Sequence, residues 1–233
     1  MSDVYAELAE LGVATVYEAS GRRGLIDAEL IQVVPGTRAA GPARTARCGE
    51  ADNLMVHAAI AHARAGDVLV LTLPRPTPVT LVGDLLATQA KVRGVAALLV
   101  DAAVRDTDDL RELGLPIWAR YVRVRGPDKD VVGVLDQPVE VGGARIRPGD
   151  VVVLDADGAV VVEQERVDEV LEAARARGAR EAEKRARLQA GELSYDLDGL
   201  RQRVEGGVWP SGQTPVVDGA NTEVRPEGQT PLP

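Results

Sequence analysis

Residues 83–106 read GDLLATQAKVRGVAALLVDAAVRD, and this stretch decides the fold. Gly83 allows a tight turn, the segment 85–93 has the composition of a helix, and Gly94 is a typical helix C-terminal stop. The apolar run 95–100 is typical of a strand that is buried on both faces. A helix that leads directly into such a strand is typical of a βαβ unit, so the stretch predicts strands that pair in parallel.

The first half of the chain repeats this alternation of helix and strand on either side of the stretch. Helices are predicted over residues 3–11, 15–20, 54–64 and 107–113. Strands are predicted over residues 31–34, 41–48, 67–71 and 117–118. Asp52 and Asn53 offer an N-cap for the helix that starts at Leu54.

The second half of the chain changes to short strands with alternating apolar residues, from Val131 to Val162, separated by turn residues. This pattern predicts an antiparallel layer or a small barrel packed on the first half. A long amphipathic helix is predicted from about residue 167 to 190, and Gly and Pro are frequent beyond Gly206. The predicted segments are a main domain over 1–165, a helical arm over 166–205, and a tail over 206–233 that is mobile or draped on the surface.

The charge and composition argue against several classes of protein. The net charge of -9 and the pI of about 4.9 argue against a nucleic-acid partner, because binding to phosphates needs a basic surface. The longest apolar runs are far too short to cross a bilayer, so no membrane partner is expected. Cys48 is the single cysteine and no secretory leader is visible, so the expected compartment is the cytoplasm.

The usual nucleophiles and metal clusters are poorly represented. None of the four serines lies in a nucleophile-elbow pattern, and of the three lysines only Lys91 is a candidate for a Schiff base. His57 and His62 are five residues apart, which misses the i,i+4 spacing of a two-histidine metal site on a helix. The chain also contains no P-loop, GxGxxG or paired CxxC motif, so nucleotide and structural zinc sites are without support.

Charged residues stand at both ends of the 83–106 stretch. Asp84 can cap the following helix, and the amides of Leu85 and Leu86 would then attract an anion to the helix N-terminus. Arg105 and Asp106 follow a strand, at the carboxyl edge where α/β proteins place their ligands. These two residues form either an ion pair or helix cap, or a divided site in which Asp106 faces a cation and Arg105 an anion.

The pair Gly83-Asp84, followed after twenty residues by Arg105-Asp106, resembles the signature of the class II pyruvate aldolases of the RraA-like family (named after the regulator A of ribonuclease E activity). The resemblance is to the 4-hydroxy-4-methyl-2-oxoglutarate/4-carboxy-4-hydroxy-2-oxoadipate aldolases. It extends to segments 14–19, 52–57, 148–151 and 183–188, and covers most of the chain to about Val204. It implies an α/β fold, an α-β-β-α sandwich of the swivelling β/β/α type, with a long C-terminal helix.

The resemblance also implies a role for each residue of the site. Asp106 would hold Mg²⁺ or Mn²⁺, Arg105 would contact the 2-oxo acid and stabilise the enolate, and the amides of Leu85 and Leu86 would hold the substrate carboxylate. Asp84 would position a water that removes the C4-hydroxyl proton. The implied reaction is a divalent-metal-dependent retro-aldol cleavage to pyruvate plus pyruvate or oxaloacetate. Oxaloacetate decarboxylation is the expected side activity.

The family builds its site at a subunit interface, which implies a homotrimer or homohexamer whose helical arm reaches a neighbouring subunit. The acidic residue that the arm would contribute aligns with Glu181, and Glu183 is the competing match. The alternative function is a non-enzymatic RraA-type regulator that binds a ribonuclease or helicase. A regulator needs none of Asp84, Arg105 and Asp106, so their presence favours the enzyme.

Overall fold

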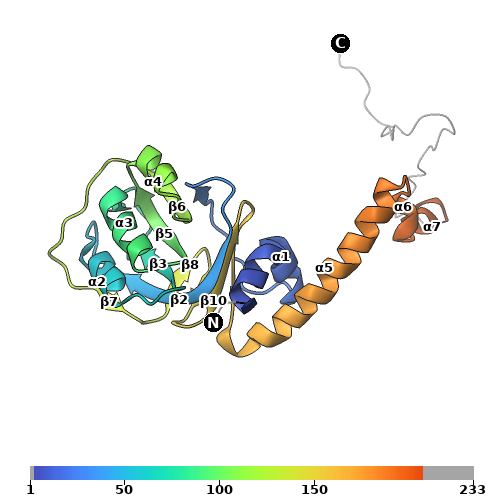
Figure 1. Ribbon diagram of the computed structural model, residues 1–233, viewed down its shortest axis with the longest axis horizontal. Coiled ribbons are helices and arrows are strands. Elements are labelled where there is room, and N and C mark those ends of the chain that lie inside the picture. The colour runs from blue at the N-terminus through green and yellow to red at the C-terminus, as the bar shows by residue number, and fades with distance from the viewer. Residues whose placement is uncertain (1–2, 207–233) are drawn as a thin grey trace, which may run out of the picture. The chain divides into compact units, whose positions relative to one another are not determined.

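The computed structural model describes residues 3–206 (Figure 1). The chain divides into two compact units, Met1–Glu181 and Ala182–Pro233. Apart from Gly206, the predicted tail over 206–233 lies outside the described residues, and the predicted boundaries at 165 and 205 stay predictions.

A mixed sheet forms the centre of the first unit, with strand order β1-β6-β5-β3-β2-β10-β11, while β4 pairs with β5 and β7 with β2. Strands β2, β3, β5 and β6 pair in parallel, and β10 pairs antiparallel with both β2 and β11. This confirms the predicted parallel pairing around 95–100 and the predicted antiparallel strands of the second half, while β1 in the first half pairs antiparallel with β6. The strands are β1 Ile31–Gln32, β2 Ala39–Arg47, β3 Val68–Thr72, β4 Thr80–Val82, β5 Ala97–Val104, β6 Ile117–Val122, β7 Val134–Leu135, β10 Val151–Asp155 and β11 Gly158–Val162; a separate hairpin joins β8 Val139–Val141 to β9 Ala144–Ile146.

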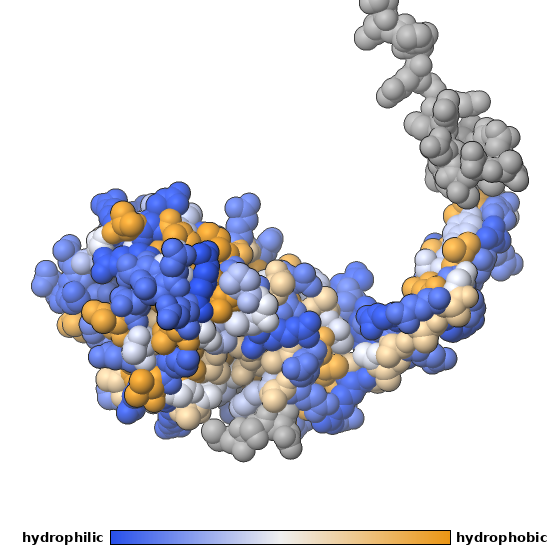
Figure 2. Space-filling view, turned by 45° about the horizontal axis from the view of Figure 1, so that its top comes forward, coloured by the Kyte–Doolittle hydropathy of each residue, from blue (hydrophilic) through white to orange (hydrophobic). Residues whose placement is uncertain are grey.

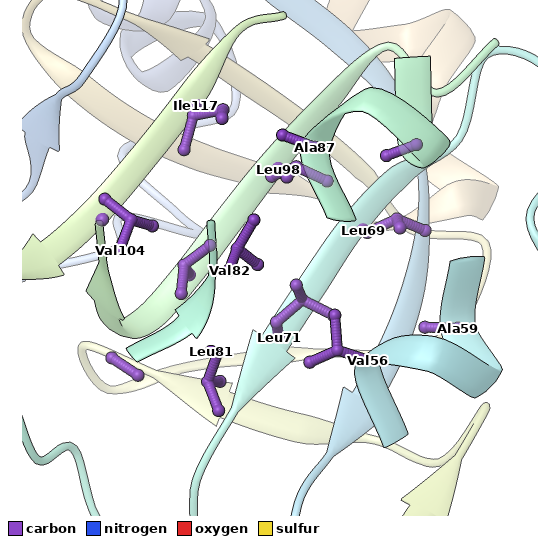
Figure 3. Close-up of a cluster of buried hydrophobic side chains, with 14 of the residues drawn as sticks. Val56, Ala59, Leu69, Leu71, Leu81, Val82, Ala87, Leu98, Val104 and Ile117 are labelled. Atoms are coloured by element: carbon purple, nitrogen blue, oxygen red, sulfur yellow. The ribbon is translucent and has the colours of Figure 1, made fainter. Parts of the chain in front are cut away.

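Three helices cover one face of the parallel strands: α2 Leu54–His62, α3 Asp84–Val92 and α4 Thr107–Leu113 (Figure 1). Their apolar residues share one core with alternate residues of the strands. Figure 3 shows this core, in which Val56 of α2 and Ala87 of α3 lie against Leu71, Leu98 and their neighbours. The short connections from β4 to α3 and from β5 to α4 are therefore held at both ends by packed elements. This fixes the positions of Gly83, Arg105 and Asp106.

The opposite face of the parallel strands packs on the antiparallel half. Leu99 and the buried Trp118 share a core with the β8–β9 hairpin and with alternate residues of β10 and β11. The indole nitrogen of Trp118 donates to the carbonyl of Asp155 at 2.8 Å, which satisfies the polar atom of this side chain. The two halves of the predicted sandwich therefore share one interior.

Helix α1, Asp3–Ala19, covers the outer side of β10 and β11 and contains a kink at Gly12, where φ is 82° and ψ is 162°. The non-helical Gly12 divides α1 into two helical segments, in agreement with the helices predicted over 3–11 and 15–20. The kink frees the amide of Val13, which donates to the buried carboxylate of Asp155 at 2.8 Å. A Cβ on residue 12 would lie 3.0 Å from that carboxylate, so glycine suits both the conformation and the space.

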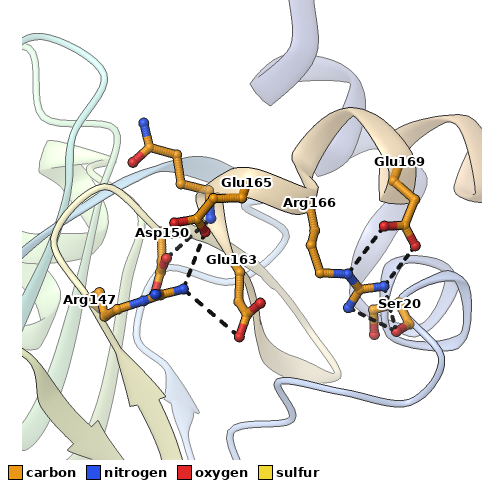
Figure 4. A network of polar contacts seen from close by, with 8 residues as sticks. Ser20, Arg147, Asp150, Glu163, Glu165, Arg166 and Glu169 are labelled. Carbon is orange, nitrogen blue, oxygen red and sulfur yellow. Dashed lines mark hydrogen bonds and ion pairs between the residues drawn. The ribbon is translucent and has the colours of Figure 1, made fainter.

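A polar network surrounds the start of α5, Val167–Gln189, inside the first unit (Figure 4). The buried carboxylate of Asp150 accepts from the amide of Arg147 at 2.8 Å and from the amide of Gln164 at 3.2 Å. Arg166 donates to the carbonyl of Ser20 at 3.3 Å and to Glu169 at 2.9 Å. The first turn of the long helix is therefore fixed by hydrogen bonds as well as by its apolar side.

The second unit contains the end of α5, α6 Ser194–Leu197 and α7 Leu200–Glu205. Lys184 donates to Asp198 at 2.6 Å, and Arg187 pairs with Glu192 at 2.6 Å, so the short helices fold back on α5 through charged groups. The face shown in Figure 2 is mostly hydrophilic along α5. No helix within residues 3–206 is long and apolar enough to cross a membrane.

Candidate active site

The sheet topology brings the two motif pairs together. Strands β4 and β5 pair in parallel, with Val82 opposite Val104, and each strand ends at that residue. Gly83-Asp84 and Arg105-Asp106 therefore leave the same edge of the sheet side by side, although they are 22 residues apart in the chain. The amide of Arg105 donates to the carbonyl of Val82 at 3.1 Å and fixes this alignment. This is the carboxyl edge at which parallel sheets bind ligands.

The N-cap residue of α3 is Gly83, one residue before the first helical residue, Asp84. The interpretation of Asp84 as a side-chain N-cap is therefore wrong. The physical reason is that the amide of Asp84 already has an acceptor, the Asp106 carboxylate at 3.3 Å. The first bond into the helix runs from the Ala87 amide to the Gly83 carbonyl at 3.1 Å, so the amides of residues 85 and 86 precede it. They are the donors that a helix N-terminus offers to an anion.

Asp106 has a left-handed backbone conformation, with φ 59° and ψ 42°, which costs a residue with a Cβ on the order of 1 kcal/mol. It stands at the N-cap position of α4 but makes no side-chain cap bond there. Its carboxylate instead reaches back to α3, so the helix-cap interpretation of this side chain is wrong as well. Backbone strain of this kind concentrates at functional sites.

Arg105 and Asp106 form a loose ion pair, with 3.5 Å between Nε and Oδ2. The two side chains are 45% and 33% exposed, so solvent and a ligand can both reach them. An accessible pair of this length contributes little to stability. Among residues 3–206 no other group donates to the carboxylate of Asp106 besides the Asp84 amide and Arg105, which leaves its Oδ1 free for a cation.

A cavity of about 390 Å³ opens beside Asp84 and Arg105. Its size is within the range of small-molecule sites. Its walls come from the segments that follow β2, β4, β5 and β6, all at the carboxyl edge of parallel strands. The residues that line it are Asn53, His57, Thr80, Leu81, Gly83, Asp84, Leu85, Leu86, Gln89, Arg105, Gly126, Pro127 and Lys129. The structure therefore brings together Asp84, Arg105 and the two predicted amides in one hollow.

Five polar residues of the cavity wall were not predicted from the sequence as site residues: Asn53, His57, Thr80, Gln89 and Lys129. The signal available for Asn53 was its place before a helix, which predicted an N-cap. It is the N-cap residue, but its side chain makes no cap bond, and Asp52 accepts from the Leu54 amide at 2.7 Å instead. The spacing of His57 and His62 was used only to argue against a two-histidine metal site and gave no signal for His57 in a cavity wall.

The chemistry of the donor set suits a hard divalent cation that keeps most of its waters. Among the described residues no cluster of three or more His, Cys, Asp or Glu is present, so a cation at this edge would have few protein ligands, and the carboxylate of Asp106 is the predicted one. A carboxylate oxygen that is partly exposed is the kind of ligand Mg²⁺ accepts, since Mg²⁺ gives up its water shell reluctantly. The residues present fit the group in this limited sense.

Glu181 is not part of the cavity wall of its own chain. It lies on α5, where it pairs with Arg177 at 2.9 Å and is 40% exposed. Within one chain the structure gives it a partner on its own helix. Its predicted approach to a neighbouring subunit therefore stays a prediction.

The nucleophiles outside the cavity are not activated. Cys48 is buried, and burial raises the pKa of its thiol to about 12, so the thiolate is scarce at neutral pH. Lys91 lies on the exposed side of α3 and donates to the carbonyl of Leu113. Neither residue lines the cavity, so Lys91, the candidate for a Schiff base, lies outside it.

The fold and the cavity place the protein among the mixed α/β proteins that have a cavity at the carboxyl edge of their parallel strands. Residues 12–161 match the family described as RraA-like, Aldolase/RraA, and the chain belongs to this family. A relative from Halalkalibacterium halodurans, named "Putative 4-hydroxy-4-methyl-2-oxoglutarate aldolase", is 34% identical over 171 residues, which are 73% of this chain and 79% of the relative. A Burkholderia mallei protein with the same name is 41% identical over 124 residues, 53% of this chain and 74% of its own.

The solved structures agree on the fold. The Streptomyces coelicolor protein RraAS2, described as an unusual member of the RNase ES inhibitor RraA protein family, superposes with a TM-score of 0.68 at 28% identity. The match covers 79% of this chain and 96% of that protein. The predicted α/β sandwich with a long C-terminal helix is thereby confirmed.

Proposed function

We propose that the protein cleaves a 4-hydroxy-2-oxo dicarboxylic or tricarboxylic acid by a divalent-metal-dependent retro-aldol reaction. The products are pyruvate and either pyruvate or oxaloacetate, from 4-hydroxy-4-methyl-2-oxoglutarate or 4-carboxy-4-hydroxy-2-oxoadipate. The observation that carries the proposal is the meeting of Asp84, Arg105 and the first residues of α3 at one cavity. Asp106 does not line the cavity, but its carboxylate contacts the Asp84 amide and Arg105 at the cavity edge. The names of the Halalkalibacterium and Burkholderia relatives support the same reaction.

Each group in the cavity has a task in this reaction. The amides of Leu85 and Leu86 bind the C1 carboxylate at the helix N-terminus. The guanidinium of Arg105 donates to the 2-oxo oxygen, where negative charge develops as the C3–C4 bond breaks and the electron pair moves toward C2. Asp84 holds a water that takes the proton of the C4 hydroxyl, while C4 becomes a carbonyl carbon. Protonation at C3 completes pyruvate.

Asp106 is the residue that would hold Mg²⁺ or Mn²⁺. When bound, such a cation would supply Lewis-acid polarisation of the 2-oxo acid. The same charge stabilisation by Arg105 serves the decarboxylation of oxaloacetate, which we propose as a side activity.

The active assembly in this proposal is a homotrimer or homohexamer in the cytoplasm. The long helix α5 carries Glu181 toward the site of a neighbouring subunit, with Glu183 as the other candidate. The partner is a small 2-oxo acid and not a nucleic acid, because the net charge of -9 repels phosphates.

The second candidate function is regulation of a ribonuclease or helicase by direct binding. It is supported by the superposition on RraAS2 of Streptomyces coelicolor. A binding regulator has no use for a left-handed Asp106 or for free helix amides at a cavity. The residues of the cavity therefore favour the lyase.

The test is release of pyruvate by the full chain, assayed with Mg²⁺ and each of the two hydroxy-oxo acids and with oxaloacetate. Pyruvate formation that stops when the metal is chelated is the expected result. If none of the three compounds yields pyruvate above the background of metal alone, the lyase proposal is wrong.

Replacement of Gly83 by alanine tests the geometry of the site. A Cβ at residue 83 would lie 2.4 Å from Oδ2 of Asp106 and 3.3 Å from Nε of Arg105, although its φ of -123° is ordinary for any residue. The obstacle is the end of a side chain, so Asp106 can move aside and the fold survives. We expect kcat/KM to fall by about tenfold or more, while the unfolding temperature changes by less than about 2 °C.

Gly126→Ala is the matched control, since its added methyl would lie at an ordinary contact distance of 3.5 Å from Arg105. It should cost far less activity than Gly83→Ala. If Gly83→Ala loses no more activity than Gly126→Ala and both stay close to the unchanged protein, Asp106 and Arg105 need no exact placement, against the proposed site.

A further inference from the structure

Two polar atoms in the cavity wall are buried and have no partner among the described residues: Oδ1 of Asn53 and Nε2 of His57. Buried polar atoms nearly always have a hydrogen-bond partner, since leaving one unpaired is costly. Both atoms belong to residues that line a hollow large enough for a ligand. Their missing partner is therefore best sought in the cavity.

The orientation of Asn53 is fixed by its other atom. Its Nδ2 donates to the carbonyl of Leu81 at 3.0 Å, and the residue is only 5% exposed. Because the amide nitrogen is used in this bond, the atom left over is an acceptor. It requires a ligand group that donates, such as a hydroxyl.

His57 lies one helical turn beyond Asn53 on α2, so the two side chains share a face of the helix. His57 and Gln89 also line a second hollow of about 510 Å³, which includes neither Asp84 nor Arg105. The two shared residues therefore mark the end of the cavity that lies away from Arg105. A substrate whose 2-oxo acid group is held by Arg105 extends its far half toward this end.

Lys129 brings a positive charge to the same cavity on the loop after β6. The buried Asp52 holds this loop, because its Oδ2 accepts from the amides of Asp130 at 2.6 Å and Val131 at 3.0 Å. The amide of Asn53 donates to the carbonyl of Asp128 at 3.0 Å, which ties the loop to the start of α2. Burial raises the pKa of Asp52, but its bonds to backbone amides and the charge of Lys129 outweigh this and lower it. Asp52 thus stays ionised and holds the loop at neutral pH.

We infer that Asn53, His57 and Lys129 form the subsite for the distal half of the substrate, an inference that rests on the proposed lyase function. Asn53 Oδ1 accepts from the C4 hydroxyl of the substrate. His57, in the tautomer with hydrogen on Nε2, and Lys129 bind a carboxylate attached to C4. The subsite selects 4-hydroxy-2-oxo acids that carry a carboxylate on C4 over those in which a methyl group takes the place of that carboxylate.

The experiment compares two reactions of the full chain with Mg²⁺. One is cleavage of 4-hydroxy-4-methyl-2-oxoglutarate, which has the distal carboxylate. The other is exchange of the pyruvate methyl protons with D₂O, followed by NMR, which needs only the 2-oxo acid half of the site. His57→Ala and Lys129→Met should each lower the ratio of the two kcat/KM values at least tenfold, chiefly through KM for cleavage.

Matched controls come from the same chain. The controls are His62→Ala and Lys91→Met. His62 lies on α2, five residues beyond His57, and Lys91 lies on α3. Neither residue lines the cavity. Both controls should leave the ratio within about twofold of the unchanged protein. Asn53→Ala is added with a thermal melt; if it does not fold, His57→Ala and Lys129→Met carry the test.

The outcomes separate the two proposals. A chain that shows neither exchange nor cleavage overturns the lyase function, and so does a chain that exchanges protons but cleaves neither hydroxy-oxo acid. Cleavage by the unchanged chain, with a ratio that His57→Ala and Lys129→Met leave unaltered, overturns the distal subsite alone. A ratio that falls in both variants and in neither control supports the subsite.

Discussion

Replacing Arg105 with alanine should lower kcat/KM for pyruvate release by about 10³-fold, because the proposed reaction places negative charge on the 2-oxo oxygen and Arg105 is the charged donor at that end of the cavity. The side chain is 45% exposed and its ion pair with Asp106 is 3.5 Å long, so little folding energy depends on it. The measurement is steady-state kinetics of pyruvate release, with a thermal melt that should be nearly unchanged.

Two further variants sharpen this result. Arg105→Lys keeps the charge but loses the planar fork of donors, so it should recover only part of the activity. Arg123→Ala removes an exposed arginine from the loop after β6, which does not line the cavity, and should behave like the unchanged protein. Full turnover in Arg105→Ala would mean that the reacting carbonyl lies elsewhere.

Much of the frame of the site could be predicted because it depends on local sequence. The buried run in 95–100 and the helix before it gave the parallel pairing, and the pairing of β4 with β5 then places two motif pairs at one edge. Strand and helix boundaries in this region depend on glycine and on apolar runs, which act over a few residues. The meeting of Asp84 with Arg105 and Asp106 followed from that frame.

The finer geometry could not be predicted, because it depends on contacts between distant segments. The Asp84 amide is satisfied by Asp106, 22 residues away, and this moves the N-cap to Gly83. The left-handed conformation of Asp106 has no local signal beyond the tolerance of aspartate for it.

The part of the cavity wall that local sequence patterns predict least is formed by Asn53, His57 and Lys129. It exists because Asp52 binds amides 78 and 79 residues further along the chain and folds the loop after β6 onto α2. Periodicity places His57 on a helix face but does not say what lies opposite that face. A lone histidine therefore carries a signal only once the fold is known.

Replacing Asp106 with asparagine should raise the Mg²⁺ concentration needed for half-maximal activity by about 100-fold or more, since the only carboxylate at the proposed cation position loses its charge. Asparagine tolerates the left-handed conformation at φ 59° and can still accept from the Asp84 amide, so the fold should be retained. Activity is measured against Mg²⁺ after chelation, and Mn²⁺ binding by calorimetry gives a readout that is independent of turnover.

Asp108→Asn provides the control for charge alone, because its side chain is 96% exposed two residues further along and does not line the cavity. It should leave the metal requirement within about twofold, since a solvent-exposed carboxylate is screened from the site. If Asp106→Asn and Asp108→Asn have the same Mg²⁺ requirement as the unchanged protein, Asp106 is not the metal ligand. Its left-handed backbone would then need another explanation, because one long hydrogen bond from the Asp84 amide and a loose ion pair with Arg105 contribute little to offset the cost of that conformation.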